Sequence, residues 1–184
     1  MIYQEVRGTR APIEGGYAIR PDGLVTFKVG RYDSRLPLVI DPVLTYATYL
    51  GGSLQERIHA VAIDASGSVI VAGETFSEDF PTADAAQPQT HGFGDAFVAK
   101  LTPSGDALVY ATYFGGSFHD AAVGVAVDAS GAAYITGSTA SWDFPTLNAF
   151  QGSPRGNFDA FVLKLDANGN LVYSTLLGGS SGDY

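Results

Sequence analysis

The eight residues YATYFGGS at positions 110–117 give the most direct evidence on architecture, because the chain contains them twice more with small changes. YATYLGGS occupies residues 46–53, and YSTLLGGS occupies residues 173–180. We call this stretch the octet, and its copies follow one another at intervals of about 64 residues. A fixed period of this kind is the sequence signature of a repeat architecture.

The octet belongs to a longer repeat. Residues 44–105 align without gaps with residues 108–169, and 31 of the 62 aligned positions are identical. Besides the octet, three blocks carry the match: VAIDASGSVIVAG with VAVDASGAAYITG (61–73 and 125–137), SEDFPT with SWDFPT (77–82 and 141–146), and DAFVAKL with DAFVLKL (95–101 and 159–165). A third copy opens with LVYSTLLGGS, so the chain holds two full repeats and the start of a third.

Each period is predicted to contain four antiparallel strands. IHAVAID (58–64) and SVIVAG (68–73) are apolar runs around an Asp-Ala-Ser-Gly turn, which is typical of a hairpin. DAFVAKL (95–101) and ALVYATYF (107–114) flank Thr-Pro-Ser-Gly-Asp and predict a second hairpin. The long stretch 74–94 joins the two hairpins.

Four antiparallel strands per repeat are typical of one blade of a β-propeller. A solenoid is the rival architecture, but its repeats are shorter, about 20–45 residues, and hold fewer elements. We therefore predict an all-β fold of propeller blades. In this interpretation the octet is the last strand of one blade, and glycines such as Gly51 and Gly52 end that strand and turn the chain toward the next blade.

The four blocks, in this order, resemble the SBBP repeat, the beta-propeller repeat of bacterial proteins. The resemblance covers residues 44–184. The stretch GRYDSRLPLVIDPVLTYATYLGGS (30–53) resembles the junction by which a β-rich domain of unknown function leads into the first such repeat. The resemblance implies a seven-bladed ring and export to the bacterial surface or exterior.

Residues 1–43 are predicted to be the C-terminal part of that upstream β-rich domain, and residues 44–184 to be the repeats. Four apolar-rich runs are expected to form a meander that ends at Asp41-Pro42: IYQEV, GGYAI, LVTFKV and LPLVI, separated by the turn-like segments RGTRAP, RPDG and GRYDSR. A closed propeller needs about 4–8 blades. We therefore expect a fragment of a longer protein, an incomplete ring that either lacks blades or associates with itself.

The amino-acid composition excludes several kinds of site and several classes of protein. The chain has no Cys, which rules out disulfides, thiolate metal sites and a Cys nucleophile. Its net charge is −9, and residues 44–184 carry four basic against fourteen acidic residues, too few for the basic stripe of a nucleic-acid binder. No apolar run approaches the ~20 residues of a membrane span, and MIYQEVRGTR shows no signal peptide.

Carboxylates that recur in every repeat favour structural roles, because a catalytic site on a propeller is usually unique and asymmetric. Three aspartates precede Gly turns, Asp64, Asp128 and Asp166, and the carboxylates that recur are Glu56, Asp120 and Asp183 after GGS, Asp79 and Asp143 in DFPT, and Asp95 and Asp159 at strand starts. The first three suggest calcium, but each turn offers one carboxylate, whereas a calcium loop packs many oxygens into a short span. We expect these three to accept backbone N–H groups in the turns.

Other motifs are weaker. Gly178 to Gly182 spell G-x-S-x-G, but the equivalent positions break the pattern and a strand, not a helix start, is expected there. His59, His91 and His119 do not recur between repeats and are expected to be independent. The pairs Phe80-Pro81 and Phe144-Pro145 are expected to fill the gap between blades, with an aromatic ligand platform as the alternative.

The sequence thus predicts no catalytic, cofactor-binding or metal-binding residue. The favoured function is a non-catalytic scaffold or interaction module, whose best binding candidates are the loops that differ between repeats, QPQTHGFG (87–94) and QGSPRGNF (151–158). One alternative is a glycan-binding, lectin-like propeller with one pocket per blade gap at the DFPT loops. A less favoured alternative is a hydrolase or lyase with a central-channel site that is not contained in this fragment, an activity that fold alone cannot support.

Overall fold

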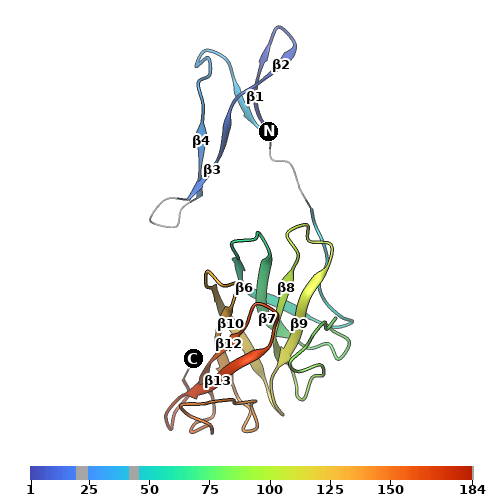
Figure 1. The fold of residues 1–184 in the computed structure, drawn as a ribbon, viewed down its shortest axis with the longest axis vertical. Helices are drawn as coiled ribbons and strands as arrows, with labels where there is room; N and C mark the ends of the chain where they lie inside the picture. Colours follow the sequence, from blue (N-terminus) through green and yellow to red (C-terminus); the bar gives the residue numbers. More distant parts are fainter. Residues whose placement is uncertain (20–24, 42–45, 184) are drawn as a thin grey trace. The chain divides into compact units, whose positions relative to one another are not determined.

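The computed structural model describes residues 1–19, 25–41 and 46–183. These residues form strands, turns and loops without any helix, so the chain is all-β, as the repeat predicted (Figure 1). It divides into two compact units, Met1–Thr45 and Tyr46–Tyr184. Within the described ranges, no helix is long and apolar enough to span a membrane.

The second unit holds two four-stranded antiparallel sheets, each made of consecutive strands (Figure 1). The first sheet has the order β6-β7-β8-β9, with bounds Glu56–Ile63, Val69–Thr75, Asp95–Leu101 and Leu108–Phe114. The second sheet has the order β10-β11-β12-β13, with bounds Asp120–Val127, Ala133–Thr139, Asp159–Leu165 and Leu171–Leu177. Both predicted hairpins of the repeat are confirmed, and each sheet corresponds to one sequence period.

The two sheets share even their irregularities. The first strand pair of each sheet has a β-bulge at the same aligned position, between Ile58 and Ala60 in one and between Ala122 and Gly124 in the other. The last strand pair of each sheet also has a register shift at an aligned position, directly after Lys100 in the first sheet and directly after Lys164 in the second. Equal register and equal bulges mean that the repeated sequence encodes one backbone twice.

The sheets pack face to face, with β10 lying against β6, β7 and β8. One continuous core joins them: Ile70, Ala72, Ala96, Val98, Tyr110 and Phe114 of the first sheet against Ala122, Ala133, Ile135, Phe144, Phe161, Leu163, Leu165 and Leu176 of the second repeat. The small alanines let the sheets approach closely, while the aromatic and branched side chains fill the space between them. This burial is the main apolar contribution to the stability of the unit.

The outer face of the first sheet carries a separate core of Val71, Phe80, Phe97, Ala99, Leu101, Ala111 and Tyr113. Leu50, from the first octet copy, packs against it. That copy forms no strand, so the prediction of a strand at residues 46–53 is wrong. The physical reason is the missing pairing partner: β9 and β13 pair with β8 and β12, but in the described part of the chain no strand pairs with residues 46–53.

The first unit contains β1 (Ile2–Val6), β2 (Thr9–Pro12), β3 (Gly15–Ile19), β4 (Val25–Val29) and β5 (Leu38–Ile40). The four predicted strands are present, but the meander is wrong: β1 lies between β2 and β5, while β3 and β4 form their own hairpin. RGTRAP is also not all turn, because Thr9–Pro12 pairs with β1. The predicted Pro-Asp-Gly turn and Pro42 lie outside the described residues.

Truncating Phe161 to Ala should lower the free energy of unfolding by about 3–5 kcal/mol, because its fully buried ring stacks on Phe144 with centroids 4.7 Å apart. Phe150→Ala is the matched control, since that ring is 89% exposed and should change stability by less than about 0.5 kcal/mol. Urea-induced unfolding followed by circular dichroism measures both. Equal stability of the two variants would contradict the assigned core.

Candidate functional site

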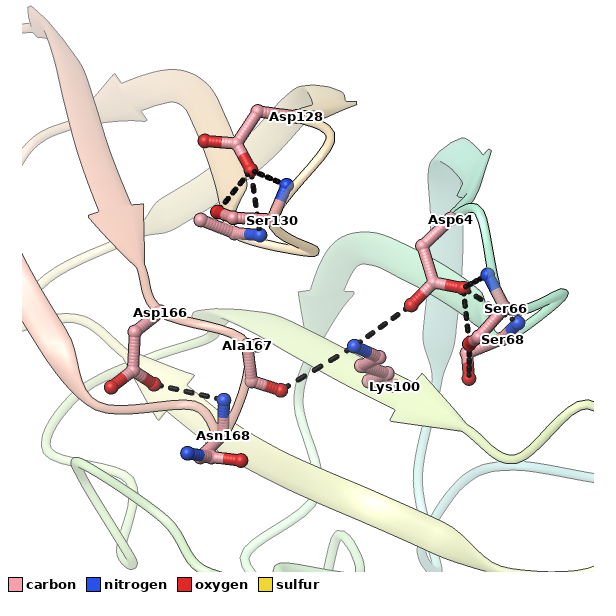
Figure 2. Close-up of polar contacts among 10 residues, drawn as sticks. Asp64, Ser66, Ser68, Lys100, Asp128, Ser130, Asp166, Ala167 and Asn168 are labelled. Carbon is pink, nitrogen blue, oxygen red and sulfur yellow. Dashed lines mark hydrogen bonds and ion pairs between the residues drawn. The ribbon is translucent and has the colours of Figure 1, made fainter.

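The aspartates that precede the Gly turns cap those turns, as Figure 2 shows. Asp64 Oδ1 accepts hydrogen bonds from the Ser66 N–H (2.8 Å), the Ser66 hydroxyl (2.6 Å) and the Ser68 N–H (3.0 Å). Asp128 Oδ1 repeats this with Ser130 and the Ala132 N–H. Asp166 accepts the N–H groups of Asn168 and Asn170, both at 2.9 Å.

These bonds lower the pKa values of all three carboxyls below their usual range, the largest cause being the hydrogen bonds from Ser66, Ser130 and Asn170. The Oδ1 oxygen of each of these carboxylates is occupied by the turn itself. Among the residues that the structure describes, no group of three His, Asp or Glu side chains is arranged to hold a metal ion. The turn-capping prediction for these aspartates is therefore confirmed.

A lysine in β8 joins the first turn to the second sheet. Lys100 Nζ lies 2.9 Å from Asp64 Oδ2 and donates to the Ala167 carbonyl at 3.4 Å (Figure 2). The ion pair is nearly closed to solvent, with side-chain exposures of 7% for Lys100 and 5% for Asp64. The aligned lysine, Lys164, lies 3.6 Å from Asp128 and remains partly exposed.

Lys100→Ala should lower the free energy of unfolding by about 3–5 kcal/mol, because it leaves the Asp64 carboxylate buried without its cation. Lys164→Ala removes the aligned but more exposed pair and should cost much less than Lys100→Ala. Urea titration of both variants at neutral pH tests this difference. Comparable losses would show that burial between the sheets adds nothing to the Lys100 pair.

The conserved spacing of GGS and DFPT within each repeat has a direct structural cause. The Ser53 N–H donates to Asp79 Oδ1 at 2.7 Å, and the Ser117 N–H donates to Asp143 Oδ1 at 2.8 Å. The next N–H in each repeat donates to a serine hydroxyl, with Leu54 bound to Ser77 and Phe118 bound to Ser141. These bonds fix the start of each repeat to the loop that follows its second strand.

Two further recurring carboxylates meet where the sheets join. Asp95 begins β8 and Asp120 begins β10, and both are fully buried. A Cβ placed on Gly115 would lie 2.5 Å from Asp95 Oδ1 and 2.7 Å from Asp120 Oδ2, so only glycine leaves room for both carboxyls. The other Asp120 oxygen, Oδ1, and Asp95 Oδ1 are buried without a hydrogen-bond partner in the described part of the chain.

Burial raises the pKa of the Asp120 carboxyl to about 6. Hydrogen bonds from Thr139, Gly116 and Ser141 act in the opposite direction, and the charge of Asp95 raises this pKa further. Burial also raises the pKa of Asp95, against the lowering effect of the His91 N–H. Proximity and burial together thus make it unfavourable to ionise both carboxyls.

Asp120 should make the protein less stable as pH rises toward neutrality. Its pKa is about 3.9 unfolded and about 6 folded, so its contribution is complete below about pH 4 and lost as pH rises through about 6. The difference corresponds to about 3 kcal/mol. Asp120→Asn should make this dependence of stability on pH clearly shallower in urea titrations between about pH 4 and pH 7.

Asp143→Asn is the control for that experiment. Hydrogen bonds from Ser117 lower the pKa of Asp143, so its effect on stability falls below the tested pH window and the slope should persist. If the Asp120→Asn variant kept the slope of stability against pH unchanged, Asp120 would not be the origin of that slope.

The DFPT phenylalanines are core residues. Phe144 belongs to the core between the sheets, and Phe80 occupies the equivalent place on the outer face of the first sheet, 4.6 Å from the Phe97 ring centroid. Phe144 therefore fills space between the two sheets. The alternative of an aromatic ligand platform is wrong for both, because each ring is buried.

The two loops that differ between repeats border hollows at equivalent places of the two sheets. Residues of loop 87–94 and Glu78 line a polar hollow: Glu78, Gln89, Thr90, His91 and Gly92. Residues of loop 151–158 and Trp142 contribute to an aromatic hollow: Phe118, Thr139, Ala140, Trp142, Pro154, Gly156, Asn157 and Asp159. Sequence reasoning missed Trp142, although its alignment with Glu78 marks it as a position that differs between repeats.

The histidines are not all independent, so that expectation is wrong for two of them. His59 Nε2 lies 3.6 Å from Glu74 Oε1, and His119 Nε2 lies 2.7 Å from Glu74 Oε2. Arg57 contacts the same buried carboxylate at 3.1 Å. The second repeat has Ala121, Val123 and Ser138 at the positions of Arg57, His59 and Glu74, and the first has Gln55 at that of His119.

This cluster links the first sheet to the segment that enters β10. A buried carboxylate beside an imidazole can orient an acid–base residue. No hydroxyl group of the described residues hydrogen-bonds either imidazole, however, so a nucleophile–base pair is not formed there. The G-x-S-x-G stretch follows β13, and no helix begins there in the part of the chain that the structure describes.

Comparison with protein families gives a match in the first unit. The model of a family described as a domain of unknown function, DUF7948, matches residues 1–43. No curated protein matches the chain.

Proposed function

We propose that the chain is part of an exported bacterial β-propeller of SBBP-type repeats that serves as a non-catalytic scaffold and interaction module. The observation that carries the proposal is the contrast between a constant framework and variable hollows. The two sheets share register, bulges and capped turns. Their equivalent hollows carry different side chains, polar in the first repeat and aromatic in the second.

The stacking of the sheets supports the propeller. The outer face of the second sheet aligns, position by position, with the face of the first sheet that is buried against it: Tyr134, Thr136, Val162, Tyr173 and Leu177 align with Ile70, Ala72, Val98, Tyr110 and Phe114. Leu177 is 45% exposed, whereas the aligned Phe114 is buried. A further sheet of the same kind would cover this face, as the second sheet covers the first.

The alternatives gain less support. A lectin with one equivalent pocket per repeat does not fit two hollows of different chemistry. A hydrolase or lyase finds its best candidate in the Glu74 cluster, which lacks a hydrogen-bonded nucleophile among the described residues. The proposed partner is a protein or a glycan, with no role in binding nucleic acid or inserting into membranes, and the location is extracellular or at the cell surface.

Size-exclusion chromatography with light scattering on this chain tests the scaffold. A discrete oligomer of β-rich chains is expected, because exposed sheet faces associate to bury apolar surface. Leu177→Asp should shift the oligomer toward monomer by placing a charge on the outer face, whereas Trp142→Ala should leave it unchanged. A native chain that stays a folded, soluble monomer at high concentration would contradict the proposal.

A further inference from the structure

The aromatic hollow of the second repeat has the properties of a binding site for one small ring. It is lined by Phe118, Trp142, Pro154 and Asn157, among others, and has a volume of about 210 Å³. This is below the ~300–1,000 Å³ of clefts for drug-sized ligands, so it fits a smaller group. We propose that the hollow binds a neutral pyranose ring of a glycan, an inference that rests on the interaction function proposed above.

Trp142 provides the flat surface. Trp142 is 74% exposed, which is unusual for the largest apolar residue. The Phe118 ring meets it edge-on, with centroids 6.1 Å apart and an interplanar angle of 64°. A contact of this kind covers at most one face of the indole, and the 74% exposure of Trp142 leaves the rest of its ring open beside Phe118.

The chemistry of the walls favours a sugar. The faces of aromatic rings carry negative charge density, and the C–H groups of a pyranose present a weakly positive edge that can lie on such a face. The Asn157 amide is exposed and makes no hydrogen bond to the described residues, so it can donate to and accept from ring hydroxyls. One apolar face beside a few polar groups is the general pattern of a specific small-ligand site.

The charges in and around the hollow favour a neutral ligand. Asp159 lines the hollow but is buried and already accepts hydrogen bonds from Gln151 and from the N–H groups of Arg155 and Gly156. Its oxygens are therefore engaged rather than free to pair with a cation. The repeats carry a large excess of acidic over basic residues, which disfavours anionic sugars.

The site is specific to the second repeat. Glu78 stands at the position of Trp142, Leu54 at that of Phe118, and Phe93 at that of Asn157. The first hollow therefore lacks the indole face and the amide together. A single sugar site in this chain differs from the repeated sites that a lectin-like propeller would have.

Trp142 is the only tryptophan of the chain, so its fluorescence reports on the hollow directly. The native chain would be titrated with methyl glycosides of glucose, galactose, mannose and N-acetylglucosamine. We expect at least one to give a saturable change in intensity with a shift to shorter wavelength, and a dissociation constant of about 1 mM, the order expected for a small weak ligand.

Variants that retain the fluorophore locate the site. Phe118→Ala and Asn157→Ala should each weaken binding by about tenfold, since each loses a wall or a hydrogen bond. Phe150→Ala is the matched control, because this exposed ring lies on the same repeat but does not line the hollow, and its binding curve should equal that of the native chain. Circular dichroism of each variant verifies that the fold is retained.

Two results would overturn the inference. One is the absence of any saturable change with all four glycosides in a folded chain. The other is a saturable change with tetramethylammonium and none with the glycosides, which would make the hollow a cation site. Light scattering separates these failures from the scaffold proposal: an oligomer that binds no glycoside leaves the scaffold standing, whereas a monomer contradicts the scaffold itself.

Discussion

The packing of one four-stranded sheet on the face of another is the constraint on which the rest of the second unit depends. The interface requires small residues where backbones approach and large ones where space remains. Within the second sheet, Gly137 of β11 is confined in a similar way by its neighbouring strands, because a Cβ there would lie 2.1 Å from the Ala121 carbonyl oxygen of β10 and 2.5 Å from the Phe161 ring of β12. The Phe161 ring in turn stacks on Phe144, so the DFPT loop is held by the same core.

Polar groups where the two sheets join fix how the sheets are positioned on each other. Hydrogen bonds from Ser53 and Ser117 to Asp79 and Asp143 attach the start of each repeat to its own loop. Lys100 reaches from its sheet to the Ala167 carbonyl of the next repeat. Apolar faces alone could slide over one another, whereas buried hydrogen bonds lose their partners when the register shifts. The recurrence of these residues follows from the recurrence of the junction.

Because the residues of the core and the junction are constrained in both repeats, few positions are left that can vary to recognise a ligand. Side chains that face the core or the junction are fixed by packing, and the loops around the hollows are not. Trp142 and Glu78 occupy one aligned position, two residues before a buried phenylalanine that is the same in both repeats. A rigid framework that carries changeable side chains at fixed places is suited to binding, because loops on a scaffold can vary without loss of fold.

Much of this architecture could be predicted from the residues alone. Period, strand content and turn positions follow from local patterns, since alternation, β-branching and Asp-x-x-Gly turns act over a few neighbouring residues. The turn-capping role of Asp64 and its equivalents was predictable for the same reason. The order of strands in the first unit was not, because pairing β1 with β5 joins residues far apart in the chain.

Contacts between residues far apart in the sequence decide the remaining features of the fold and of the candidate sites. Arg57 lies opposite Glu74 in the β6–β7 hairpin, but His119 reaches the same carboxylate from the next repeat, and no local spacing predicts that contact. The first octet copy has the letters of a strand yet forms none, because a strand needs a neighbour to satisfy its backbone groups. Local chemistry therefore fixed which segments can be strands and turns, and three-dimensional packing fixed which strands pair, which carboxyls are buried together and which aromatic ring remains open to a ligand.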